Sequence, residues 1–132
     1  MLVIRQEQIQ HFIAADENQL VEVIAQSMRK TNPERVSDFD DKTLQEMVKV
    51  GIERAKSHGL ERAEEIAAFV GVMFEIAPNF DEQEEIKKVF DDTNFPAPAR
   101  FEQLWDRVSP EAWEKAEQEY NLNVWFPITS DK

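Results

Sequence analysis

The chain has 132 residues, of which 42% are hydrophobic, enough for a buried core. It has no cysteine, which excludes disulfides, thiol nucleophiles, zinc fingers and iron–sulfur clusters. Fifteen basic and 27 acidic residues give a net charge of −12, which disfavours direct nucleic-acid binding. No apolar run approaches the ~20 residues of a membrane span, and the first residues do not resemble a signal peptide. We therefore expect a cytoplasmic protein that binds neither membrane nor nucleic acid.

Helix formers fill most of the chain between its six prolines, and hydrophobic residues recur at helical spacing. The clearest stripe is Ile66, Phe69, Val70, Met73 and Phe74. The pattern predicts helices over residues 5–15, 17–30, 41–57, 61–76, 81–90, 97–107 and 110–120, with a short turn over 33–37.

Local signals mark several helix ends. Asp40 is the predicted N-cap of the helix over 41–57, and Gly59 is its predicted stop. Ser109 followed by a proline is typical of a helix start. Asn79 or Phe80 is expected to precede the helix over 81–90, because an acidic first turn follows them and suits the helix dipole.

No alternating strand pattern is convincing, so we predict an all-α fold, an irregular small bundle of about six to seven helices. Residues 1–120 are expected to form a single helical domain. Residues 121–132 are expected to form an extended, aromatic C-terminal tail, with Leu122, Val124 and Phe126 on one side.

Residues that would carry catalysis are scarce. Three glycines leave no phosphate-binding loop. His11 lies four residues after Glu7, but two ligands do not make a metal site. Asp38 opens an apparent calcium loop that fails because Thr43 and Lys49 hold the positions that require glycine and glutamate. We expect no enzymatic activity, no metal and no cofactor.

Acidic charge is concentrated in the second half of the chain. Residues 1–60 carry 8 basic and 10 acidic side chains, whereas residues 61–132 carry 7 and 17. Trp105 and Trp113 are interpreted as core, because large aromatic side chains usually pack inside. The C-terminal aromatic residues either attach the tail to the core or are offered to a partner. The predicted protein-binding residues are Asp81, Glu82, Glu84, Glu85, Asp91, Asp92, Glu111, Glu114, Glu117, Glu119, Trp125 and Phe126. The alternative for the acids is that they are ordinary solvated helix faces.

Two segments carry a family resemblance. Residues 51–60 read Gly-Ile-Glu-Arg-Ala-Lys-Ser-His-Gly-Leu, and residues 72–81 read Val-Met-Phe-Glu-Ile-Ala-Pro-Asn-Phe-Asp. They resemble the patterns G-I-x-R-A-x-x-Y-G-I and L-M-F-x-x-G-P-x-F-D of small helical proteins encoded in bacterial type VI secretion loci. These proteins are typically encoded beside spike proteins (VgrG and PAAR types), adaptors and toxic effectors.

The resemblance covers about residues 1–107. The opening residues 1–8 also fit, as do Pro33-Glu34 after the second helix and an arginine-led helix at Arg100. His58 stands where the pattern has tyrosine, and Ala77 stands where it has glycine. No catalytic residue can be carried over from the family.

The resemblance implies an accessory protein that binds a cognate effector or spike protein in the producing cell, as a chaperone- or adaptor-like loading factor. An alternative is an immunity protein that blocks the effector's active site, with its acidic surface imitating a phosphate-bearing substrate. A metal- or carboxylate-dependent enzyme is a third interpretation, motivated only by the abundance of Asp and Glu. The oligomeric state is not predicted.

Overall fold

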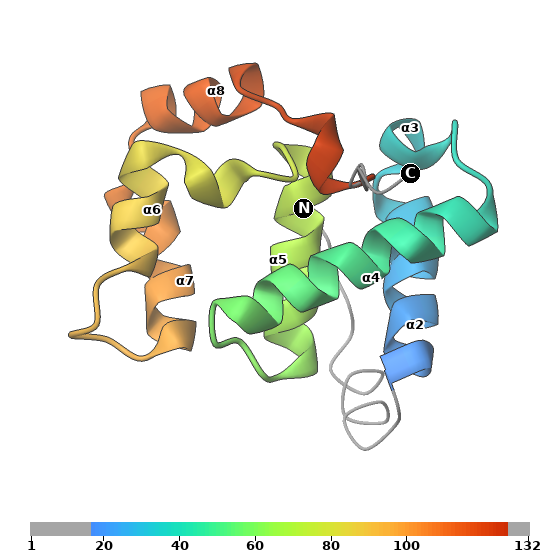
Figure 1. The fold of residues 1–132 in the computed structure, drawn as a ribbon, viewed down its shortest axis with the longest axis horizontal. Coiled ribbons are helices and arrows are strands. Elements are labelled where there is room, and N and C mark those ends of the chain that lie inside the picture. Colours follow the sequence, from blue (N-terminus) through green and yellow to red (C-terminus); the bar gives the residue numbers. More distant parts are fainter. Residues whose placement is uncertain (1–16, 127–132) are drawn as a thin grey trace, which may run out of the picture. The chain divides into compact units, whose positions relative to one another are not determined.

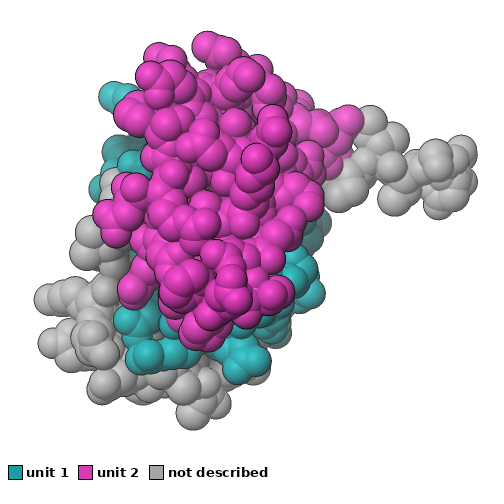
Figure 2. All heavy atoms as spheres, turned by 90° about the vertical axis from the view of Figure 1, so that its left-hand side faces the viewer, with its two compact units in different colours: residues 1–75 teal, residues 76–132 magenta. Residues whose placement is uncertain are grey.

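The computed structural model describes residues 17–126. The chain divides into two compact units, residues 1–75 and residues 76–132, coloured teal and magenta in Figure 2. The boundary between the units falls inside the segment 1–120, for which a single domain was predicted.

The fold is all-α, as predicted, and residues 17–126 contain no strand. The first unit contains α2 (Glu17–Thr31), α3 (Pro33–Val36), α4 (Asp41–Ser57) and α5 (Ala63–Glu75) (Figure 1). The second unit contains the short 3-10 helix η1 (Phe80–Glu82), α6 (Glu84–Phe90), α7 (Ala97–Arg107), α8 (Pro110–Gln118) and the 3-10 helix η2 (Leu122–Val124). Within the described residues, no helix has the length and apolar character to cross a membrane.

The predicted bounds hold for α4 and α7, and those of α2, α5 and α8 differ by at most two residues at each end. The predicted helix over 81–90 is wrong in one respect, because η1 and α6 share this segment. The predicted helix over 5–15 lies outside the described residues.

The C-terminal segment is not extended as far as residue 126. The side chain of Asn121 accepts a hydrogen bond from the backbone N–H of Asn123 at 3.0 Å, and this contact helps to begin η2. Residues 127–132, the rest of the predicted tail, lie outside the described residues.

In the first unit, α5 packs against both α4 and α2. α5 is apolar on nearly all sides, as expected of a helix surrounded by its neighbours. Gly51 lets α4 approach α5 closely: a Cβ at this position would lie 2.9 Å from a methyl carbon of Val70. The predicted ends of α4 are confirmed. Asp40 accepts a hydrogen bond from the N–H of Thr43 at 2.8 Å, and Gly59 adopts a φ of 87°.

In the second unit, α6 contacts α7, α8 and η1. The predicted cap of α6 at Asn79 or Phe80 is wrong. The side chain of Gln83 caps this helix, accepting hydrogen bonds from the N–H groups of Glu85 and Ile86 at 2.8 and 3.0 Å. Asn79 instead fixes the chain beyond α8. Its amide donates to the carbonyl oxygen of Glu119 and accepts from the N–H of residue 121, both at 2.9 Å.

Candidate protein-binding site

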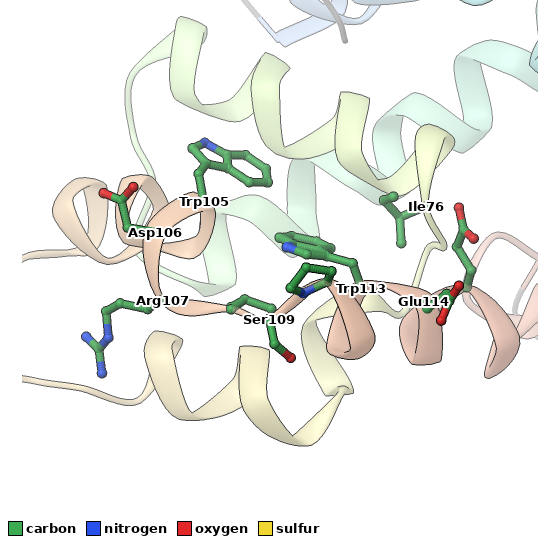
Figure 3. Close-up of a pocket in the computed structure, with 10 residues that line it drawn as sticks. Ile76, Trp105, Asp106, Arg107, Ser109, Trp113 and Glu114 are labelled. Atoms are coloured by element: carbon green, nitrogen blue, oxygen red, sulfur yellow. The ribbon is translucent and has the colours of Figure 1, made fainter.

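A hollow of about 700 Å³ opens on the second unit where α7 turns into α8 (Figure 3). We call it the tryptophan groove. Its lining residues are Ile76, Trp105, Asp106, Arg107, Val108, Ser109, Pro110, Trp113, Glu114 and Glu117.

Helical spacing explains which side chains of α8 line the groove. Pro110, Trp113, Glu114 and Glu117 follow positions i, i+3, i+4 and i+7, so they share one face of the helix. The small side chains of α8, Ala112 and Ala116, are buried on another face. α8 therefore carries a separate stripe for the groove besides its core face.

On α7, Phe101 and Leu104 pack inside, and Val108, which directly follows the helix, is buried as well. Trp105 lies four positions after Phe101, so it shares the same face of α7. It lies at the edge of that face, and 45% of its surface is exposed.

The corner between α7 and α8 is held by a carboxylate of α6. Ser109 donates two hydrogen bonds to Glu85, from its backbone N–H at 2.8 Å and from its hydroxyl at 3.1 Å. The same hydroxyl accepts from the N–H of Ala112 at 3.2 Å, which confirms the predicted N-cap of α8. These contacts fix the start of α8, and with it the position of Trp113 beside Trp105.

Five aromatic rings form a closed circuit under the groove. Trp105 and Trp113 stack with ring centroids 5.2 Å apart and planes 22° apart. Trp113 also stacks on Phe80 at 6.2 Å. Phe90 contacts Phe80 at 6.2 Å and Phe101 at 6.5 Å. Phe101 closes the circuit edge-on against Trp105 at 5.9 Å. Such pairs stabilise by about 0.5–1.5 kcal/mol each beyond their burial, so the exposed indole has a firm support.

The two indole N–H groups of the groove have no hydrogen-bond acceptor among the described residues. Neither is a buried unsatisfied donor, because no buried side-chain polar atom within residues 17–126 lacks a partner. Trp105 and Trp113 therefore offer hydrogen-bond donors as well as apolar surface.

The charged groups of the groove are unequally paired. Asp106, Glu114 and Glu117 form no ion pair with any residue that the structure describes. Arg107 lies 3.1 Å from a carboxylate oxygen of Asp92, and in Figure 3 its side chain extends away from the indole rings. Three carboxylates thus remain without a counter-charge around the tryptophans.

Asp92 is a suitable partner for this arginine. The backbone N–H of Asn94 and, after it, the guanidinium of Arg107 hold the pKa of Asp92 below its usual 3.8. The pair therefore stays charged through the neutral range, and Arg107 does not neutralise the groove.

Of the acids predicted to bind a partner, only Glu114 and Glu117 line the tryptophan groove. Glu84, Glu85 and Glu111 line a second hollow, of about 390 Å³, which also contains Lys88 and Lys115. The remaining exposed acids, Glu82, Asp91 and Glu119, line neither of these two hollows, and Asp91 pairs with Lys87 at 2.8 Å. Asp81 is buried, with 6% of its surface exposed.

The two predicted aromatic contacts behave differently. Trp125 is buried, and its indole N–H donates to the hydroxyl of Tyr120 at 3.0 Å. Of the two roles left open for this residue, attachment of the C-terminal segment therefore fits better. Phe126 is 38% exposed.

The interpretation of Trp105 as a core residue is wrong, and Trp113 is only half-buried. The sequence contained a signal for Trp113 alone, which shares its face of α8 with glutamates rather than with the buried Ala112 and Ala116. Trp105 lies four positions after Phe101, a spacing that is typical of a core position, so its exposure could not be read from the pattern.

Comparison of the chain with protein-family models, with curated proteins and with solved structures finds no match. Among residues 17–126, no three His, Asp or Glu side chains gather in an arrangement that could hold a metal ion.

Proposed function

We propose that this chain is a non-enzymatic, cytoplasmic protein-binding module of bacterial type VI secretion. It binds a cognate toxic effector in the producing cell as an accessory factor for loading, and it does so through the tryptophan groove. The observation that carries the proposal is the exposed indole of Trp105, stacked on Trp113.

Tryptophan supports such a role because it supplies a large contact area with few rotatable bonds, and it dominates many protein interfaces. The aromatic circuit adds to this. Since Phe101 and Trp113 already hold the exposed ring, little conformational freedom remains to be lost on binding. The groove is therefore better suited to a macromolecular contact than scattered apolar residues would be.

The immunity alternative draws on a specific observation. Asp106, Glu114 and Glu117 have no counter-charge among the described residues, and an effector that acts on a phosphate-bearing substrate has a basic cleft. A complex with such a cleft would block the effector's active site, whereas a loading complex would leave it active.

The test is recovery of the tagged full-length chain from producing cells, with the toxic activity of the recovered effector measured. Trp105→Ala is compared with Leu122→Ala, because Leu122 is 55% exposed and lies outside the groove. We expect the wild type and Leu122→Ala to recover an active effector, and Trp105→Ala to lose it.

An effector recovered inactive would favour the immunity alternative. Recovery of no effector or spike component, or equal recovery by Trp105→Ala, would contradict the proposal.

A further inference from the structure

Resting on that proposed function, we propose the chemistry of the partner segment: an apolar side chain flanked on both sides by arginine or lysine. The apolar side chain sits against the indole rings of the tryptophan groove. The flanking cations pair with Asp106 at one end of the groove and with Glu114 at the other.

The arrangement of the groove supports an apolar side chain between two charges. In Figure 3 the indoles of Trp105 and Trp113 lie between Asp106 on one side and Glu114 on the other. Ile76, which is half-buried, adds aliphatic surface on the Glu114 side. A segment that crosses the rings therefore meets a carboxylate at each end.

Charge complementarity requires the flanking residues to be basic. The three acids of the groove have no ion-pair partner within the described residues, while Arg107 is held by Asp92 at 3.1 Å and by Gln103 at 2.6 Å. Arginine fits better than lysine, because its planar guanidinium can stack on an indole and pair with a carboxylate at the same time.

The same charges disfavour other occupants. A second copy of this chain in a two-fold contact would bring identical carboxylates toward each other. A phosphate-bearing or other anionic ligand would meet three unpaired carboxylates. The indole N–H groups of Trp105 and Trp113 can also donate to the backbone carbonyls of a peptide segment.

The experiment titrates the full chain with synthetic peptides and follows the indole N–H resonances by NMR. The chain has three tryptophans, so three resonances are assigned by replacing each tryptophan in turn with phenylalanine. The probe has a central leucine, two arginines on each side and alanines elsewhere. Three control peptides carry citrulline for arginine, glutamate for arginine, or serine for leucine.

We expect the arginine–leucine peptide to shift the Trp105 and Trp113 resonances and to leave Trp125, which is buried, unchanged. The citrulline and serine peptides should each bind at least about fivefold more weakly, and the glutamate peptide should not bind. Raising NaCl from 50 to 500 mM should weaken the arginine peptide severalfold, because exposed charges are screened.

A matched pair of double variants isolates the charges of the groove. Asp106→Asn with Glu114→Gln removes one acid from α7 and one from α8 inside the groove. Glu102→Gln with Glu111→Gln removes one acid from each of the same helices outside it; both of these side chains are exposed. We expect the first double variant to weaken the arginine peptide about fivefold or more, and the second to change it less than about twofold.

Absence of a shift at Trp105 and Trp113 at millimolar peptide would overturn the inference. So would equal binding of the citrulline peptide, or equal effects of the two double variants. If an effector is captured through Trp105 but its affinity changes neither with the NaCl concentration nor with removal of the groove acids, the inference fails and the proposed function stands. If the arginine peptide binds as described but no effector is recovered, the proposed function fails and the ligand chemistry stands.

Discussion

The two units place their large hydrophobic side chains differently. In the described part of the first unit, none of these side chains is exposed, and Phe69 and Phe74 are buried. The second unit carries all the exposed ones within residues 17–126, namely Phe95, Trp105, Tyr120, Leu122 and Phe126. The first unit uses its apolar residues for its own packing, whereas the second also uses them to build a supported surface.

The largest effect is expected when a buried ring that supports the tryptophan groove is removed. Phe80→Ala deletes a ring that is fully buried and contacts both Phe90 and Trp113. We expect the free energy of unfolding to fall by about 3–5 kcal/mol, measured by urea denaturation followed by circular dichroism. Phe95→Ala, at an exposed ring, should cost less than about 1 kcal/mol; equal costs would show that the circuit is not a packed support.

The next largest effect tests the close packing of the first unit. Gly51→Val would place a side chain against Val70, since a Cβ alone already lies 2.9 Å from its methyl carbon. We expect a loss of about 1–3 kcal/mol in the same denaturation measurement. Val50→Ala, one position earlier on α4 at a half-buried site, serves as the control. A neutral Gly51→Val would mean that α4 and α5 separate easily.

Glu85 does not line the groove, but we expect the corner between α7 and α8 to depend on it. Glu85→Ala removes both hydrogen bonds to Ser109, and we expect a loss of about 1–2 kcal/mol in unfolding free energy. Binding of the arginine–leucine peptide should also weaken, because the position of Trp113 depends on this corner. Glu84→Ala, at the exposed neighbouring residue, should change neither quantity.

Trp105→Ala should separate stability from binding. The side chain is 45% exposed and loses two ring contacts, so we expect only about 0.5–1.5 kcal/mol of destabilisation. The loss of partner binding should be much larger. A Trp105→Ala variant that unfolds as readily as Phe80→Ala would instead make Trp105 a core residue.

The smallest expected effect is on the stability of the chain at acid pH. The pKa of Asp92 lies below 3.8 in the folded chain, because Asn94 and Arg107 stabilise its charged form. The unfolded chain therefore binds this proton more readily. The contribution of Asp92 to stability is present above pH 3.8 and is lost as the pH falls through the lowered pKa. Asp92→Asn should make the stability fall less steeply below pH 3.8, measured by urea denaturation at a series of pH values. An unchanged slope would contradict this assignment.

The local features of the fold could be predicted from the sequence because short-range contacts determine them. Asp40 caps α4 through a residue three positions away, and Ser109 caps α8 in the same way. Gly59 ends α4 through its own backbone conformation. By contrast, Gln83 is not among the preferred capping residues, so the start of α6 gave no recognisable signal.

The candidate site depends on contacts between distant residues, and these could not be read from spacing alone. Glu85 and Ser109 are 24 positions apart, and nothing in either segment indicates that they pair. The acidic charge of the second half was visible in the sequence, but which acids remain unpaired was not. The charge therefore indicated the region of the surface, and the tertiary contacts select Glu114 and Glu117 within it.

The stacking of Trp105 on Trp113 has an optical consequence. Two indoles with ring centroids 5.2 Å apart couple their electronic transitions, so the pair adds its own contribution to the ultraviolet circular dichroism of the chain. A ligand that enters the groove and tilts one ring changes that coupling. The surface thus contains its own chromophore, and its occupancy can be followed without any attached label.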